Sequence, residues 1–151
     1  MSKLYRSQTV STSADNVWKQ LADYEGIGKW NPNLNQSFLL NGSDKQGVGA
    51  LRQCDLKDGK NWIRERVVEW KEGESYTVDI YEGTMPLKVA KATLGVKSLG
   101  NNQSEVFMEM EYTMKMGVVG AMMDVLMMRS MMKKNMDKVL SGLSTSARQA
   151  A

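Results

Sequence analysis

The chain has 151 residues, a formal net charge of +3, 13 methionines, a single cysteine and no histidine. Its length predicts one domain over residues 1–151, large enough to bury a substantial core. The lack of histidine excludes Ser-His and Cys-His catalysis. Cys54 alone can form neither an intramolecular disulfide nor a cysteine zinc cluster, so we expect no metal and no cofactor.

Basic residues are spread along the chain, except where Lys133, Lys134 and Lys138 share one helical face. Such a face is usually solvated, and nucleic-acid binding needs a denser basic patch with interleaved aromatic residues. The first ten residues lack the apolar core of a signal peptide. We therefore expect a cytoplasmic protein that binds no nucleic acid.

The N-terminal part of the chain predicts a strand followed by two short helices. Leu4–Val10 alternates weakly, as a strand does. Ser13 is a suitable N-cap for a helix that begins just after it. Gly26 ends this helix, and Ile27–Trp30 adds one further helical turn before Pro32.

The middle of the chain predicts an antiparallel sheet. Short runs of alternating residues are joined by turn sequences such as Asn41-Gly42 and Asp58-Gly59. With the first strand they give seven predicted strands: Leu4–Val10, Leu34–Leu40, Ala50–Leu56, Asn61–Trp70, Tyr76–Ile80, Ala90–Lys97 and Met108–Met116.

The last strand leads directly into the longest predicted helix. The apolar face of the strand consists of Met108, Met110, Tyr112, Met114 and Met116. The period of two ends at Gly117, and a helical period follows. One face of this helix carries a continuous apolar stripe of Ala121, Val125, Met128, Met132, Met136, Val139 and Leu143.

Eleven of the 13 methionines lie between Met108 and Met136. A methionine stripe at helical spacing most often belongs to a packed core. Methionine is also unbranched and polarizable, and it fills irregular or changing gaps. Because a methionine-rich strand precedes a methionine-rich helix, the alternative interpretation is that the two face each other across a deformable cavity.

The order of elements predicts an α+β fold, in which the long helix covers the concave face of a strongly curved antiparallel sheet. Several local sequences occur in a recognisable order along essentially the whole chain: Val17-Trp18 with Leu21, Asp23-Tyr24-Glu25-Gly26, Trp30-Asn31-Pro32, Gly47-Val48-Gly49 with Arg52, Arg64-Glu65-Arg66-Val67, Pro86 and the glycine-rich start of the last helix. In this order the chain resembles the SRPBCC superfamily, which includes polyketide cyclase/dehydrase-like, START-like lipid-transfer and pollen-allergen-like domains.

The resemblance implies the helix-grip fold: a curved seven-stranded antiparallel sheet wrapped around a long C-terminal helix, with two short helices after the first strand. It also implies a deep cavity between sheet and helix that holds an apolar small molecule. Members of the superfamily differ in function, so the fold alone does not decide the activity.

Arg52 lies on the apolar face of its strand, between Ala50 and Cys54. One interpretation is structural, with its guanidinium either reaching out to solvent or paired to a carboxylate such as that of Glu65. The other is a buried cation that anchors a carboxylate, carbonyl or phosphate of a ligand. For Glu65 a structural role is favoured over general acid/base catalysis. Tyr112 points inward and needs a hydrogen-bond partner, which a polar group of a ligand would supply.

No residue is assigned a catalytic or metal-binding role. The residues expected to line the ligand cavity are Trp30, Arg52, Cys54, Leu56, Glu65, Val78, Ile80, Met85, Leu87, Met108, Met110, Tyr112, Met128, Met132 and Met136. For Trp30 the equal alternative is that it anchors its loop onto the core.

Three classes of function fit these features. The favoured one is a carrier or sensor that binds a hydrophobic lipid-like, aromatic or polyketide-like molecule. The second is a polyketide cyclase- or aromatase-like enzyme, for which only Arg52, Glu65, Tyr112 or water would be available as acids and bases. The third is a protein-interaction module.

The start of the last helix carries apolar residues outside the inward stripe, namely Val119, Met122, Met123, Leu126 and Met127. A contiguous exposed patch of this kind usually marks an interface. The loops after Gly26 and Gly83 are short, so a homodimer through this patch is favoured over coverage by the loops, and membrane contact is less favoured.

Overall fold

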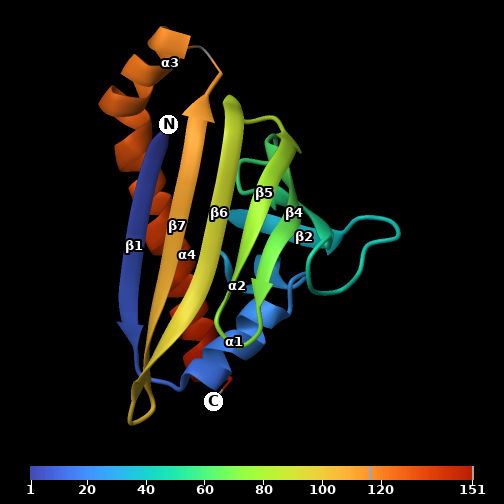
Figure 1. Cartoon of the computed structure of the whole chain (residues 1–151), viewed down its shortest axis with the longest axis vertical. Coiled ribbons are helices and arrows are strands. Elements are labelled where there is room, and N and C mark those ends of the chain that lie inside the picture. The colour runs from blue at the N-terminus through green and yellow to red at the C-terminus, as the bar shows by residue number, and fades with distance from the viewer. Residues whose placement is uncertain (116, 151) are drawn as a thin grey trace.

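The computed structural model describes residues 1–115 and 117–150, so Met116, which was predicted on the methionine face, lies outside the described residues. Seven antiparallel strands form one sheet in the order β1-β7-β6-β5-β4-β3-β2 (Figure 1). The strands are β1 (Ser2–Val10), β2 (Leu34–Leu39), β3 (Leu51–Leu56), β4 (Trp62–Lys71), β5 (Ser75–Gly83), β6 (Leu87–Gly100) and β7 (Gln103–Met114). The predicted seven-stranded sheet is confirmed.

Two short helices, α1 (Ala14–Ala22) and α2 (Ile27–Trp30), connect β1 to β2. As predicted, Ser13 is the N-cap of α1, and its hydroxyl accepts a hydrogen bond from the backbone N–H of Asn16. Val17 and Leu21 of α1 are buried in the core.

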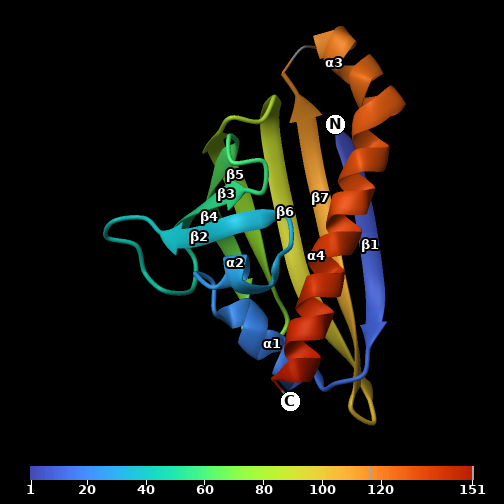
Figure 2. The same cartoon turned by 180° about the vertical axis from the view of Figure 1, so that it is seen from behind.

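The last helix begins with α3 (Gly117–Met123), continues through a π-helical turn, η1 (Asp124–Met128), and ends with α4 (Arg129–Gln149). Figure 2 shows α4 running along one face of the sheet in front of β1 and β7. At Gly142 a Cβ atom would lie 2.1 Å from the backbone oxygen of Trp30, so glycine permits the close approach of α4 to α2. The helix-grip arrangement that the sequence predicted is confirmed.

The inward stripe of the last helix is shorter than predicted. Met128, Met136, Val139 and Leu143 are buried, but Ala121 and Val125 are exposed. Two causes account for the difference. In both views α3 extends past the ends of the strands, so no sheet lies beside it. The π-helical turn also changes the helical phase and turns Asp124 inward in place of Val125.

None of the helices in the described parts of the chain combines the length and the apolar character needed to cross a membrane.

Candidate functional site

A cavity of about 170 Å³ lies between the sheet and the last helix. Its walls are mostly apolar and come from every strand except β1. The lining residues are Ile27, Asn31, Asn33, Leu34, Arg52, Cys54, Leu56, Ile63, Glu65, Tyr76, Val78, Ile80, Met85, Leu87, Ala92, Leu94, Met108, Met110, Met128, Met131, Met132, Asn135, Met136 and Val139. A dry engineered cavity of ~150 Å³ binds benzene, so this space suits a ring-sized apolar molecule.

The accessible side of the cavity is marked by lining residues that solvent reaches. Met131 of α4 is 48% exposed, while Met85 and Leu87 on the opposite wall are half-buried. Asn33 and Asn135 lie near each other on this side, because the Asn33 side-chain amide donates a 2.9 Å hydrogen bond to the backbone oxygen of Asn135. Flexible methionine side chains therefore border the entrance.

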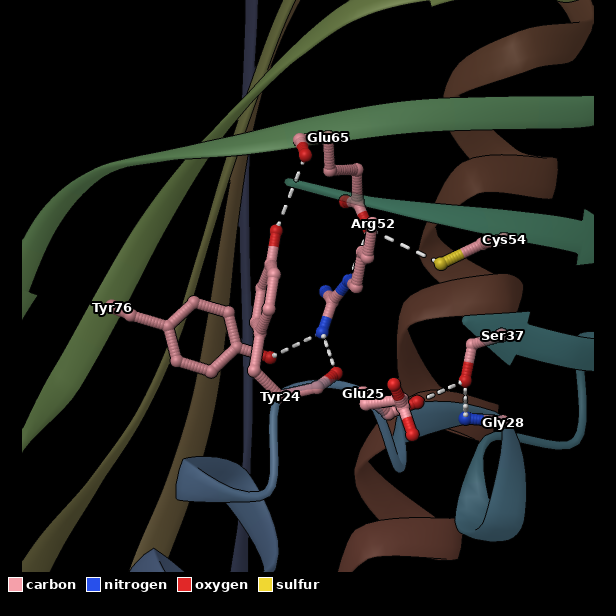
Figure 3. A network of polar contacts seen from close by, with 8 residues as sticks. All are labelled: Tyr24, Glu25, Gly28, Ser37, Arg52, Cys54, Glu65 and Tyr76. Carbon is pink, nitrogen blue, oxygen red and sulfur yellow. Dashed lines mark hydrogen bonds and ion pairs between the residues drawn. The ribbon is translucent and has the colours of Figure 1, made fainter. Parts of the chain in front are cut away.

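The buried side of the cavity contains an ion pair. Arg52 and Glu65 are directly opposite each other in the β3–β4 register, and their side chains are 1% and 7% exposed. Arg52 Nε donates a 2.8 Å hydrogen bond to Glu65 Oε1. Arg52 Nη1 donates to the backbone oxygen of Tyr24 at 2.8 Å and to the Tyr76 hydroxyl at 3.4 Å (Figure 3). Of the two structural alternatives for Arg52, pairing with Glu65 is present, whereas reaching out to solvent is wrong because the side chain is buried. Contact of Arg52 with a ligand stays a prediction.

Two tyrosine rings enclose the guanidinium of Arg52. Its central carbon lies 3.9 Å from the centroid of the Tyr24 ring and 5.6 Å from that of Tyr76, which are cation–π distances. Burial alone would lower the pKa of Arg52, but the carboxylate of Glu65 beside it raises the pKa above its ordinary value. Arg52 is therefore a permanent cation.

Other protonated groups surround the pair. The thiol of Cys54 lies 3.3 Å from Glu65 Oε1 and donates to it. Burial, and then the negative charge of Glu65, raises the pKa of Cys54 well above its ordinary value. Burial likewise raises the pKa of Tyr76. At neutral pH both groups keep their protons, so neither is a ready nucleophile or base.

A second polar cluster lies where η1 meets the sheet. The carboxylate of Asp124 is buried and accepts hydrogen bonds from the hydroxyls of Tyr112 and Ser2. Ser2 and Tyr112 are paired in the β1–β7 register, so both donors come from adjacent strands. Tyr112 thus has a partner within the protein, and a ligand is not needed to supply one.

All the residues predicted to line the cavity do so except Trp30 and Tyr112. Trp30 is packed into the core from α2, and Tyr112 is turned toward Asp124. Whether the lining residues contact a ligand stays a prediction.

Several lining residues were missed by the sequence reasoning. Alternation within the predicted strands places Tyr76 on the same face as Val78, and Ala92 on the same face as Leu94; this was the signal that could have added all three. Asn31, Asn33 and Asn135 carry no such signal because they lie in a loop or on the flank of a helix.

Comparisons with known proteins give the family. Residues 1–148 match the family model described as polyketide cyclase / dehydrase and lipid transport. A search of curated proteins found no match.

Solved structures share the fold at low sequence identity. An aromatase/cyclase, Zhui, from a Streptomyces species superposes with a TM-score of 0.81 at 15% identity, covering 98% of this chain and 94% of that one. A START superfamily protein from Mycobacterium smegmatis has a TM-score of 0.79 at 15% identity, with 99% of each chain covered. Norcoclaurine synthase from Thalictrum flavum, solved with dopamine and hydroxybenzaldehyde, has a TM-score of 0.70 at 14% identity, covering 98% of this chain and 87% of that one. The family match over nearly the whole length shows that the chain belongs to the polyketide cyclase/dehydrase and lipid transport family, within the SRPBCC superfamily.

Proposed function

We propose that this protein is a carrier or sensor that binds a small apolar molecule with one neutral polar group in the cavity between the sheet and the last helix. Membership of the family supports binding of a hydrophobic molecule in general. The observation that carries the finer proposal is the distribution of polarity in the cavity: a methionine-rich wall with few polar residues, among which the described lining has one charged position, the Arg52–Glu65 pair. Apolar walls with few placed polar groups are typical of ligand sites.

The ion pair favours a neutral polar group over an anion. A ligand carboxylate beside Arg52 would also lie near the carboxylate of Glu65, and like charges at low dielectric repel strongly. A hydroxyl or carbonyl can hydrogen-bond to either member of the pair without this repulsion. The charge balance therefore argues against the anionic anchor that the sequence also suggested for Arg52.

The same arrangement supports binding over catalysis. Catalysis by general acid and base requires a group that exchanges a proton near neutral pH and can reach the substrate. Glu65 is held by Arg52 and Cys54, and Cys54 and Tyr76 keep their protons because burial raises the pKa of each. These polar groups therefore hydrogen-bond to one another and are not available to exchange protons with a substrate.

The methionines allow ligands of more than one size. The cavity of about 170 Å³ suits a ring-sized molecule as it stands, and Met85, Met131 and Met132 border its accessible side. Methionine side chains have three rotatable bonds and adapt to different shapes. We therefore expect the volume to increase when a larger ligand binds.

A fluorescent probe tests the cavity directly. N-phenyl-1-naphthylamine is neutral and becomes fluorescent in apolar surroundings, and we expect it to bind with a Kd in the low micromolar range. Met110→Trp should fill the cavity and weaken binding roughly tenfold, since Met110 is a buried lining residue. Met127→Trp is the matched control, because Met127 is exposed and lies outside the cavity lining. Equal binding by the parent and both variants would mean that the probe does not occupy this cavity.

Competition tests the polar group. We expect 2-naphthol to displace the probe at roughly tenfold lower concentration than 2-naphthoate, because only the anion is repelled by Glu65. Stronger displacement by 2-naphthoate would restore Arg52 as an anionic anchor.

A further inference from the structure

The start of the last helix presents a wide apolar surface that is not covered by the rest of the described chain. Seven large apolar residues between positions 118 and 127 are between 42 and 80% exposed. They are Val118, Val119, Met122, Met123, Val125, Leu126 and Met127, which we call the helix tip. At ~100° per residue these positions spread over an arc of roughly 200°, about half of the helix circumference. Its first turns, α3, extend past the ends of the strands in both views (Figures 1 and 2).

The tip carries no exposed charge of its own. Asp124 is the only ionisable residue from 117 to 128, and its carboxylate is buried against Ser2 and Tyr112. The π-helical turn is what places it there. The only charge that would oppose contact with an apolar environment is therefore directed away from the surface.

Basic residues lie on both sides of the tip. Lys115 precedes it, and Arg129, Lys133 and Lys134 follow it in the sequence. Lys88 lies near Lys115, because the backbone N–H of Lys115 donates to the carbonyl of Pro86 and Leu87 pairs with Met114. All of these except the partly buried Arg129 are exposed. The apolar tip thus has a basic border.

We propose that the helix tip docks this protein onto a membrane surface that contains anionic lipids. An apolar helix surrounded by basic side chains lies in the boundary between headgroups and acyl chains, with its cations at the negative headgroups. Residues 117–128 are fewer than the ~20 needed to span a bilayer, so the tip enters one leaflet only. The methionines and valines face the acyl chains, and Lys88, Lys115, Lys133 and Lys134 face the phosphates.

A second copy of the chain fits this surface less well, although the sequence favoured a homodimer. A two-fold interface covers one side of a helix and would leave the edges of this wide apolar arc in water. It would also bring the two basic borders together. A lipid phase covers all sides of the tip at once, and its charge is complementary to the border.

The docked surface is continuous with the entrance of the cavity. Met128, Met131 and Met132, which follow the tip on the same helix, line the cavity. Docking would bring this entrance close to the lipid. The proposal rests on the surface alone, however, and stands whether or not the cavity binds the ligand proposed above.

Vesicle binding tests the proposal. The full chain should co-sediment with vesicles of equal parts phosphatidylcholine and phosphatidylglycerol, bind phosphatidylcholine alone roughly tenfold more weakly, and dissociate as salt is added. Met122→Glu combined with Leu126→Glu should reduce binding to the mixed vesicles by at least roughly tenfold. The control is Val48→Glu combined with Leu99→Glu, which makes the same charge change at apolar residues that are also more than half exposed but lie outside the tip. Equal loss in both double variants would overturn the proposal.

A second measurement does not depend on a loss of binding. Leu126→Trp should be quenched by brominated lipids in mixed vesicles, whereas Val48→Trp should show no quenching beyond that of the parent, which has four tryptophans of its own. Sedimentation velocity without lipid measures whether the protein is a monomer or a dimer, and so distinguishes the membrane from a second copy as the partner of the tip. A parent that is a dimer, with a monomeric Met122→Glu/Leu126→Glu variant and no vesicle binding, would overturn the proposal in favour of a second copy. A monomer without vesicle binding would overturn it as well.

Discussion

Glu65 and Asp124 are both buried carboxylates, with 6 and 5% of each residue exposed, but the fold satisfies them in different ways. Glu65 forms an ion pair with Arg52 inside the sheet and also accepts from the Cys54 thiol. Asp124 accepts hydrogen bonds from two hydroxyls, those of Ser2 and Tyr112, where the last helix leaves the sheet. One carboxylate is neutralised by a cation, whereas the other is stabilised by neutral donors.

The two buried carboxylates have different structural roles. The Arg52–Glu65 pair connects two neighbouring strands with the α1–α2 connection through the carbonyl of Tyr24, and it supplies the charged residues of the cavity lining. Asp124 holds the first turns of the last helix against β1 and β7 and removes a charge from the helix tip. A buried ion pair is sensitive to loss of one partner, whereas hydroxyl donors contribute smaller amounts each. Variants at the two positions should therefore differ in magnitude.

The largest effect is expected for Arg52→Met. The substitution leaves the carboxylate of Glu65 buried without its cation, and breaking such a pair costs ~3–5 kcal/mol of unfolding free energy. Adding Glu65→Leu should restore most of the lost unfolding free energy, because two apolar side chains of similar size need no charged partner. Urea denaturation followed by circular dichroism measures both variants.

The control for this comparison is a surface pair. Arg64 and Glu82 form an ion pair with a 3.3 Å N–O distance, and both side chains are at least one-third exposed. Arg64→Met should cost at most ~1 kcal/mol. If Arg52→Met and Arg64→Met lose equal stability, the buried pair does not hold the sheet and α1–α2 together as described.

A smaller loss is expected for Asp124→Ala. Two hydroxyls, one fully buried, lose their acceptor, which costs ~1–3 kcal/mol. Alanine is the better helix former of the two residues, so helix propensity acts in the opposite direction and cannot cause the loss. Hydrogen exchange should show faster exchange from residue 117 to 128 and unchanged protection in the second half of α4. Equal acceleration along the whole helix would mean that Asp124 does not act locally.

The sequence allowed the ion pair to be anticipated but not the hydroxyl cluster. Arg52 and Glu65 lie on strands joined by the Asp58-Gly59 turn, and the period of two places both side chains on the inward face. Alternation also located most of the cavity wall, from Val78 to Met110. These features depend on local periodicity, which one sequence contains.

The features that the sequence did not predict depend on contacts between distant residues, which periodicity does not encode. A regular helix would have placed Val125 inside, but the π-helical turn placed Asp124 there. Tyr112 was correctly assigned to the inward face. Its hydrogen-bond partner, Asp124, lies on the last helix, beyond the connection that follows β7, and alternation along the strand does not predict it. For Trp30 the sequence left two alternatives, the border of the cavity and the core, and the residue packs in the core of the fold because its position is set by the short helix α2.

The smallest effect concerns Tyr112 and depends on pH. Burial, together with the hydrogen bond to Asp124, raises the pKa of Tyr112 to about 12, compared with ~10 in an unfolded chain. Because the folded state holds the proton more tightly, the contribution of Tyr112 to the unfolding free energy is complete below about pH 10 and is lost as the pH rises through about 12.

Tyr112→Phe should lower the unfolding free energy by about 1 kcal/mol at neutral pH. Between about pH 10 and 12 the unfolding free energy of this variant should fall less steeply than that of the parent. Burial also raises the pKa of Tyr24 and Tyr76, but both stay in the variant, so the difference between the two curves isolates Tyr112. Urea unfolding at a series of alkaline pH values measures it, and parallel curves would show that the hydroxyl of Tyr112 titrates as if it were free in water.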